Sequence, residues 1–207
     1  MLWVLLCLGS DVLIIKHRVN SVEELRLVPR HYGVEVDVHY YDSTVVVGHD
    51  PQQNTVSFDS YLLEFEHNFL AVNIKQEGIE KTVLAHLKDH DISNFFLFDL
   101  TFPSLMHTMM TGERRLALRI SDFEDVKNLS FFKGKVDWVW IDIFQDPDYL
   151  EKTDWSTLSS FKKCLVSPEL HIMRDYAISQ NIKGNLSAHI DKFEAVCTKD
   201  PFFWGNL

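Results

Sequence analysis

Two carboxylate side chains, Glu35 and Asp37, lie two residues apart in the segment GVEVDVHY. In an extended strand, residues at this spacing point to the same face, while the valines between them point to the other. In a parallel sheet with both faces covered, two enclosed carboxylates would repel each other unless a cation neutralised them. We therefore expect a hard divalent ion with oxygen ligands, Mg2+ or Ca2+, at this place.

Two histidines flank this pair in the sequence. His17, followed by Arg18, ends an apolar run in KHRVN, and His49 follows a short β-branched run in VVVGHDP. Imidazole suits proton transfer because its ordinary pKa of about 6.5 lets either protonation state be populated near neutrality. One histidine at a strand end is more often a structural group. The order of all four residues is more informative, because parallel strands would bring them around one opening.

Eight short apolar runs could position these side chains, and segments with helical periodicity separate them. Alternation of strands and helices predicts parallel strands with right-handed crossovers, and eight such units predict a closed (β/α)8 barrel. We expect one domain over residues 1–207, since the Gly-rich turn of the rival doubly wound sheet is missing. The eight runs are VLIIKHR from 12, VEVDVHY from 34, FLAVNIK from 69, FFLFDL from 95, LALRIS from 116, VDWVWIDIF from 136, KCLVSPEL from 163 and FEAVCTK from 193.

Helix-start signals support the intervals between these runs. Ser21 and Glu24 form a capping-box pattern, and Asp146 followed by Pro147 predicts an N-cap with proline at the first helical position. The helices expected are EELRLV at 23–28, FDSYLLEFE at 58–66, EKTVLAHLKDH at 80–90, SLMHTMM at 104–110, DFEDVKNL at 122–129, DPDYLEK at 146–152 and MRDYAISQ at 173–180.

Composition narrows the classes of partner. The formal charge of −10 has the wrong sign for a broad nucleic-acid surface, although a local cation could still attract a small anionic substrate. Cys7, Cys164 and Cys197 lack metal-binding or redox spacing, which favours reduced, buried thiols. The apolar start MLWVLLCLGSD is too short for a membrane span; we interpret it as structural, with a degenerate signal peptide as the alternative, and expect a cytoplasmic protein.

The order of motifs resembles that of the glycerophosphodiester phosphodiesterase family and its relatives among the phosphatidylinositol-phospholipase-like barrels, including the sphingomyelinase D enzymes of spider venoms. HRVNS, GVEVDV and VVVGHDP match the family pattern over residues 17–51, while NIK at 73–75 and TKDP at 198–201 match it more thinly. The resemblance implies proton transfer by His17 and His49, metal binding by Glu35 and Asp37, and a phosphate-facing Lys75.

The departures from the family pattern concern the metal and the substrate. Asn73 stands where relatives supply a third carboxylate; an amide oxygen can still ligate Mg2+ or Ca2+, but with one negative charge fewer. Val19 replaces a glycine, and the segment 50–58 is too short for the family's glycerol-covering insertion. These differences weaken the implied metal site and leave the substrate head group open.

The function expected is metal-dependent cleavage of a small-molecule or lipid-derived phosphodiester, with Arg18 and Lys75 balancing the phosphate charge. Hydrolysis and cyclising transfer both remain open. One alternative is a non-catalytic or metal-weakened binding barrel of the same family, and another is a different barrel enzyme such as a metal-dependent aldolase or isomerase. The other polar or aromatic residues near strand ends are expected to be mainly structural: Asp99, Arg119, Trp140, Asp142, Glu169 and Trp204.

Overall fold

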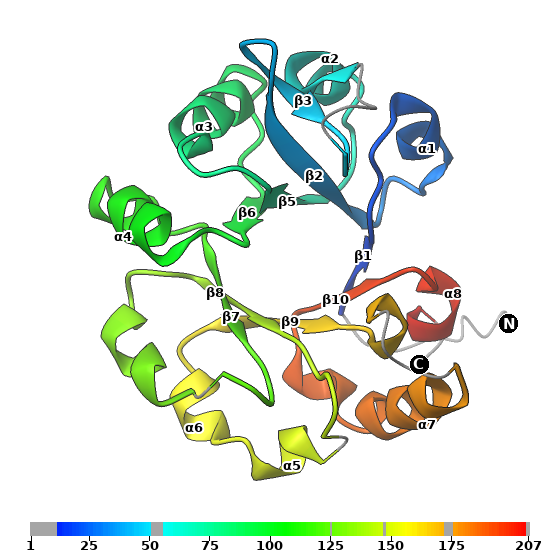
Figure 1. The fold of residues 1–207 in the computed structure, drawn as a ribbon. Coiled ribbons are helices and arrows are strands. Elements are labelled where there is room, and N and C mark those ends of the chain that lie inside the picture. Colours follow the sequence, from blue (N-terminus) through cyan, green and yellow to red (C-terminus); the bar gives the residue numbers. More distant parts are fainter. Residues whose placement is uncertain (1–11, 51–55, 125, 147, 172–175, 206–207) are drawn as a thin grey trace, which may run out of the picture.

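A closed parallel barrel forms the centre of the molecule. The computed structural model describes residues 12–50, 56–124, 126–146, 148–171 and 176–205 (Figure 1). Within these ranges, eight parallel strands surround the barrel axis, which confirms the predicted (β/α)8 fold. They are β1 (Leu13–Lys16), β2 (Gly33–Tyr41), β5 (Phe69–Ile74), β6 (Phe95–Phe98), β7 (Ala117–Ile120), β8 (Trp138–Ile141), β9 (Lys162–Val166) and β10 (Ala195–Thr198).

Two junctions close the sheet. The first and last strands pair in parallel from Leu13 opposite Ala195 to Lys16 opposite Thr198. Strands β6 and β7 meet more weakly, through a bridge between Leu97 and Leu116 and a 2.9 Å hydrogen bond donated by the Leu97 backbone N–H. Closure places the carboxyl ends of all eight strands around one mouth, where barrels carry their functional groups.

Helices lie outside the strands, as Figure 1 shows. Their apolar faces pack on the outward-facing side chains of the strands in one large core cluster. The helices are α1 (Val22–Leu27), α2 (Phe58–Leu63), α3 (Glu80–Asp89), α4 (Phe102–Met110), α5 (Tyr149–Lys152), α6 (Trp155–Leu158), α7 (Tyr176–Ser187) and α8 (Pro201–Trp204), with 3-10 turns at Val126–Phe132, Pro168–Leu170 and Ile190–Lys192.

The helix-start predictions had mixed outcomes. Ser21 caps α1 by accepting the Glu24 N–H at 3.1 Å, which confirms the predicted N-cap. The reciprocal bond of a capping box is shifted by one residue, because Glu24 Oε2 accepts the Asn20 N–H at 3.1 Å. The predicted cap of α5 is wrong, because Asp148 occupies that position. Asp146 instead accepts the Asp148 N–H at 3.0 Å, two residues along, and closes a local turn before the helix begins. Pro147 lies outside the described residues.

The segment expected as a helix at 122–129 was also predicted wrongly. It contains a 3-10 turn at Val126–Phe132, preceded by a turn around Asp122. The Asp122 carboxylate accepts three backbone N–H groups from the loop after β8, at Phe144, Gln145 and Asp146. Because these contacts hold Asp122 against a neighbouring loop, it does not cap a helix of its own. The expected helix at 173–180 is found as α7, although residues 173–175 lie outside the described ranges.

Strand β2 extends into a hairpin that the sequence had indicated only as a short β-run. It pairs antiparallel with β3 (Thr44–Val47), which in turn pairs with β4 (Val56–Ser57). Asp42 and Ser43 both have positive φ, 45° and 64°, as a two-residue hairpin turn with the twist of its strands requires. The hairpin returns the chain to the barrel mouth, where the Gly48 N–H donates to the Asp37 carbonyl at 3.0 Å.

The barrel interior is filled by aromatic rings below the mouth. Phe96 packs within 6.1 Å of Phe69, Phe98, Trp138 and Trp140, measured between ring centroids. Cys164 and Cys197 are buried free thiols, which confirms the prediction for these two, whereas Cys7 lies outside the described residues. In the described part of the chain, no helix has the length and apolar character needed to cross a membrane.

Candidate active site

Strand β2 carries Glu35 and Asp37 into the barrel mouth on the face predicted from their spacing. Their exposed fractions are 0% and 1%, so both carboxylates are enclosed. The valines between and beside them belong to the outer core cluster and face the helices. The alternation therefore reflects an enclosed polar interior with apolar packing outside, as expected for a parallel barrel strand.

Glu35 is only partly satisfied. Its Oε2 accepts the Arg18 backbone N–H at 2.7 Å and lies 3.6 Å from His17 Nε2, while its buried Oε1 has no hydrogen-bond partner. Burial, and then the neighbouring Asp37, raise the pKa of Glu35 to about 8. Without a bound metal ion, this carboxyl would therefore be protonated at neutral pH.

Asp37 is held by groups from three directions. Lys75, just beyond β5, places Nζ 3.0 Å from Oδ1, and Arg18 Nε lies 3.6 Å from Oδ2. Asn20 donates from Nδ2 to Oδ2 at 2.7 Å and accepts the Asp37 N–H through Oδ1 at 2.9 Å. Asn20 was not among the predicted site residues. An asparagine after a strand is an ordinary loop residue, and only the position of this loop against β2 reveals its role.

His17 lies at the end of β1, and its N–H donates to the Thr198 carbonyl at 2.9 Å across the barrel closure. Burial, and then the positive charges of Arg18 and Lys199, lower the pKa of His17 to about 3. The ring is therefore neutral at pH 7, and its buried Nδ1 has no hydrogen-bond partner. Arg18 takes a positive φ of 55°, which turns its backbone N–H toward Glu35.

Asn73 on β5 lies opposite Asp37 in the parallel register. Its Oδ1 is buried and without a hydrogen-bond partner. Two unpartnered oxygens, on Glu35 and Asn73, thus lie on adjacent strands beside Asp37. Oxygen ligands of this kind fit Mg2+ or Ca2+. No group of three His, Cys, Asp or Glu side chains in the described ranges has the proximity of a metal site, so the amide of Asn73 would be a required ligand.

His49 is the one predicted site residue that does not contact the others. The hairpin brings it to the same mouth, next to Gly48, but its side chain is exposed. It makes no hydrogen bond or ion pair with His17, Glu35 or Asp37 in the described structure. The structure therefore assembles His17, Arg18, Glu35, Asp37, Asn73 and Lys75, and leaves His49 at the rim.

A third imidazole, His39, follows Asp37 by two residues on β2 and was not singled out from the sequence. It is 3% exposed, and neither ring nitrogen has a hydrogen-bond partner by geometry. Burial lowers its pKa. Its spacing from Asp37 was the available signal, because residues two apart on a strand share a face.

Two residues expected to be structural have structural contacts. Glu169 accepts hydrogen bonds from Thr198 Oγ1 at 2.5 Å and from the Lys199 N–H at 3.1 Å, which links the ends of β9 and β10. Trp204 is buried and donates from Nε1 to Ser167 Oγ at 2.8 Å. Asp99, Arg119 and Asp142 meet on the opposite side of the mouth.

The fold and this mouth define a (β/α)8 barrel with a polar site at the carboxyl ends of its strands. No protein-family model matches the chain, and no curated protein matches it. Among solved structures, it is similar to one named "Putative glycerophosphoryl diester phosphodiesterase" from Agrobacterium tumefaciens strain C58. That match has a TM-score of 0.63 and 11% sequence identity, and covers 93% of this chain and 95% of the other. At this identity the likeness confirms the fold, and with it the resemblance predicted from the motifs at the level of architecture.

Proposed function

We propose that this protein is a metal-dependent phosphodiesterase that cleaves a glycerophosphodiester or phospholipid-type phosphodiester. One observation carries the proposal: three buried polar atoms without hydrogen-bond partners, His17 Nδ1, Glu35 Oε1 and Asn73 Oδ1, come from three adjacent strands at the barrel mouth. Buried polar atoms in native proteins are nearly always satisfied. Their concentration here supports a site built for groups that bind during function.

The basic residues beside the carboxylates suit an anionic substrate. Arg18 is 43% exposed and Lys75 is 30% exposed. Each can therefore contact a ligand in the mouth while it also pairs with Asp37. A phosphodiester carries one negative charge and accepts charge-assisted hydrogen bonds from such groups. Asn20 holds Asp37 in place from behind, which keeps the carboxylate oriented while Lys75 turns toward the phosphate.

The two histidines supply proton transfer in this proposal. His17 is neutral and can accept a proton from an attacking hydroxyl; the approach of an anionic phosphate would raise its pKa and strengthen it as a base. His49, on the hairpin at the rim, would deliver a proton to the leaving oxygen. This role requires the exposed His49 side chain to turn into the mouth when substrate binds.

Glu35, Asp37 and Asn73 are the residues that would hold the divalent ion. Bound there, Mg2+ or Ca2+ would act as a Lewis acid on the phosphoryl group and stabilise its developing charge. The ion would share Asp37 with Lys75 and would receive two formal negative charges from its protein ligands. We therefore expect weaker binding than a site with three carboxylates would give.

The test is turnover of a glycerophosphodiester, a lysophospholipid and a sphingolipid phosphodiester with Mg2+, with Ca2+ and with a chelator. We expect turnover of at least one substrate that requires the metal, with 31P spectra distinguishing a cyclic from a linear product. Glu35→Gln and Asp37→Asn should abolish the metal-dependent turnover. His107→Ala on the outer helix α4 serves as the matched control. A folded protein that binds metal but turns over none of these substrates would contradict the proposal.

A second candidate is a binding barrel that has lost catalysis. Asn73 in place of a carboxylate, the ion pair between Lys75 and Asp37, and the exposed His49 favour it. In that case a phosphodiester would bind with unchanged affinity after chelation, and no product would form. Calorimetry with and without chelator distinguishes the two functions.

A further inference from the structure

A second polar cluster occupies the other side of the barrel mouth. The ends of β6, β7 and β8 contribute Asp99, Arg119 and Asp142, and the segment after β9 contributes His171. These residues follow four consecutive strands, β6 to β9, of which β6 pairs with β5; none of them belongs to β1, β2 or β5, which carry His17, Glu35, Asp37 and Asn73 or end just before them. The proposed chemistry uses none of them.

Ion pairs hold Arg119 in a fixed orientation. Its Nη2 contacts Asp99 Oδ1, and its Nη1 lies 3.2 Å from Asp142 Oδ2. Asp142 is 2% exposed and lies 3.4 Å from His171 Nε2 through its other oxygen. The side chains of Arg119 and Asp99 are 37% and 25% exposed. The buried Asp142 therefore positions Arg119, which shares its strand face with the interior residue Ala117, while Arg119 and Asp99 stay partly exposed at the strand ends.

The backbone at this cluster is also unusual. Asp99 adopts a φ of 59°, in the left-handed region that few residues other than glycine occupy. Such conformations concentrate at binding and catalytic sites, where the surrounding structure holds them in place. At Asp99 this conformation accompanies a side chain paired with Arg119, so the strained residue is one that can touch a ligand.

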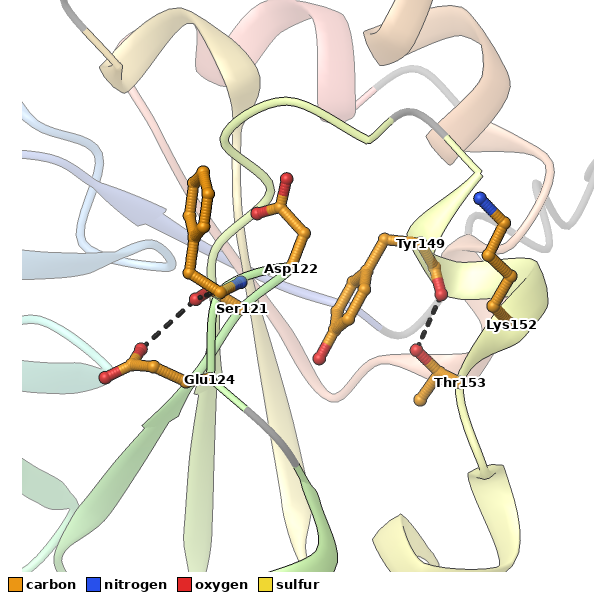
Figure 2. A pocket seen from close by; sticks show the side chains of 7 residues that line it. Ser121, Asp122, Glu124, Tyr149, Lys152 and Thr153 are labelled. Carbon is orange, nitrogen blue, oxygen red and sulfur yellow. Dashed lines mark hydrogen bonds between the residues drawn. The ribbon is translucent and has the colours of Figure 1, made fainter.

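A pocket of about 320 Å3 opens beside the cluster, between the loop after β7 and helix α5 (Figure 2). Its lining combines hydroxyl, carboxylate, ammonium and aromatic side chains, from Ser121, Asp122, Phe123, Glu124, Tyr149, Lys152 and Thr153. Ser121 directly follows β7 and lies two residues beyond Arg119, so the pocket begins next to the strand end that carries Arg119. Phe144 packs on the His171 ring at 4.5 Å and adds an apolar surface near the same loops.

We propose that Arg119 and Asp99 form a second subsite, which binds a neutral, hydroxyl-bearing group of the substrate. This inference rests on the proposed function, because it assigns the alcohol beyond the scissile phosphodiester to this side of the mouth. Each hydroxyl can donate one hydrogen bond and accept others, which matches the guanidinium donors of Arg119 and the acceptor oxygens of Asp99. Asp142 and His171 are positioning residues for Arg119.

The charges of the cluster disfavour the other kinds of ligand. An ammonium group would be attracted by Asp99 but repelled by Arg119, and a second anionic group would meet the reverse conflict. An alkyl group would leave the exposed donors of Arg119 and the oxygens of Asp99 without partners, which binding sites penalise strongly. A polyol avoids all three costs.

Binding of phosphate monoesters tests this subsite without requiring turnover. Glycerol 3-phosphate, phosphocholine and ethyl phosphate present the same phosphate with a polyol, a cation or an alkyl group. By calorimetry with the full chain and Mg2+, we expect glycerol 3-phosphate to bind at least about tenfold more tightly than either of the others. In Arg119→Met the ratio of affinities for glycerol 3-phosphate and ethyl phosphate should fall to about one.

Two further variants guard against a folding artefact. Asp99→Asn keeps a residue that tolerates positive φ and should lower the same ratio while retaining the fold. Arg114→Met removes an arginine that pairs with Asp137, near the starts of β7 and β8, and should leave the ratio unchanged. Equal affinities for the three esters in the wild type, a preference for phosphocholine, or no binding of any ester would overturn the subsite. A retained polyol preference without phosphodiester turnover would overturn the proposed function and leave the subsite supported.

Discussion

The two sides of the barrel mouth are built from the same kind of strand end, but their polar residues are distributed differently along the chain. On the side of β1, β2 and β5, His17, Arg18, Glu35 and Asp37 are close in sequence and form recognisable motifs. On the side of β6 to β9, each strand end contributes a single residue, from Asp99 to His171. Dense motifs reveal a site before the fold is known, whereas isolated residues become a site only when the barrel closes.

The charge balance differs as well. Glu35 and Asp37 face several basic groups, and Arg18, Lys75 and Lys199 all act on the titration of His17. Across the mouth, one arginine faces Asp99 and Asp142, with Glu124 acting on both members of the Arg119–Asp142 pair. The first side therefore suits an anion and a metal ion, and the second suits a neutral polar group. The variants that follow test this division.

The largest expected effect is a difference in kcat between variants of His17, which lies beside the buried Glu35, and of His171, which lies beside the buried Asp142. His17→Ala should lower kcat for a phosphodiester at least about a hundredfold, because it removes a proton acceptor from the reacting centre. His171→Ala should lower kcat less than about tenfold, since that ring only supports Arg119 through Asp142. Steady-state kinetics with melting curves for both variants provide the measurement. Equal losses of kcat in the two variants would contradict the assignment of the chemistry to the β1, β2 and β5 side of the mouth.

His49→Ala should also lose about a hundredfold in kcat, although the ring is exposed and without contacts to the carboxylates. The pH profile of kcat/KM is the informative readout. The wild type should give a bell-shaped profile from two groups in opposite protonation states, and each histidine variant should lose one limb. Unchanged turnover in His49→Ala would remove His49 from the proposed chemistry.

The affinity of the proposed metal site should respond to an added charge only when that charge lies on the β1, β2 and β5 side of the mouth. Asn73→Asp adds a carboxylate opposite Asp37 and should tighten Mg2+ or Ca2+ binding by about tenfold. Asn94→Asp, between α3 and β6 on the outside of the barrel, adds the same charge away from the mouth and should leave the affinity unchanged. Isothermal titration of both variants provides the comparison, and equal changes would indicate a general charge effect.

Titration of Asp142, on the β6 to β9 side of the mouth, should make the free energy of unfolding depend on pH. Burial, against the opposing effect of Arg119 and with the added negative charges of Asp99 and Glu124, raises its pKa from 3.8 to about 7. The folded chain therefore retains a proton that the unfolded chain releases. The stability from this proton is complete below about pH 4 and is lost as the pH rises to about 7, with about 1.4 kcal/mol for each pKa unit between the two states.

Asp142→Asn cannot ionise, so its free energy of unfolding should change less than that of the wild type between pH 4 and pH 7. Denaturant titrations at several pH values test this expectation. Asp154→Asn, at the exposed cap of α6, is the control. His171 contacts Asp142 at 3.4 Å and its ring can itself carry a proton, so His171→Gln is measured in parallel. Superimposable pH curves for the wild type and Asp142→Asn would contradict the raised pKa.

The smallest expected effect concerns the N-caps of the helices that follow strands on the two sides of the mouth. Ser21→Ala removes the cap of α1, which follows the loop that carries Asn20, and Thr101→Ala removes the cap of α4 after β6. Each should lower the free energy of unfolding by about 1 kcal/mol, because one backbone N–H loses its partner. Measured by denaturant titration, losses well above this value would show that a cap also holds its side of the mouth.

The sequence by itself determined the architecture and the first side of the mouth. Eight apolar runs separated by amphipathic segments specify parallel strands with helices between them, because this pattern buries the apolar residues on both faces of the strands. The two-residue spacing of Glu35 and Asp37 placed both carboxylates on one face, and β5 then set Asn73 beside them. The helix at 122–129 was predicted wrongly because Asp122 accepts hydrogen bonds from a neighbouring loop that only the fold supplies. The helix start at Asp146 was predicted wrongly because its carboxylate accepts the Asp148 N–H in a local turn before the helix.

Only the tertiary structure decided which isolated residues meet. Asn20 reaches Asp37, and Arg119 reaches both Asp99 and Asp142, because parallel pairing of neighbouring strands brings their carboxyl ends together across the intervening helices. The hairpin of β2 and β3 likewise returned His49 to the mouth without bringing it into contact with the carboxylates. Strand patterns fix the direction of side chains locally, whereas distances across the mouth depend on register and loop paths that no local pattern encodes.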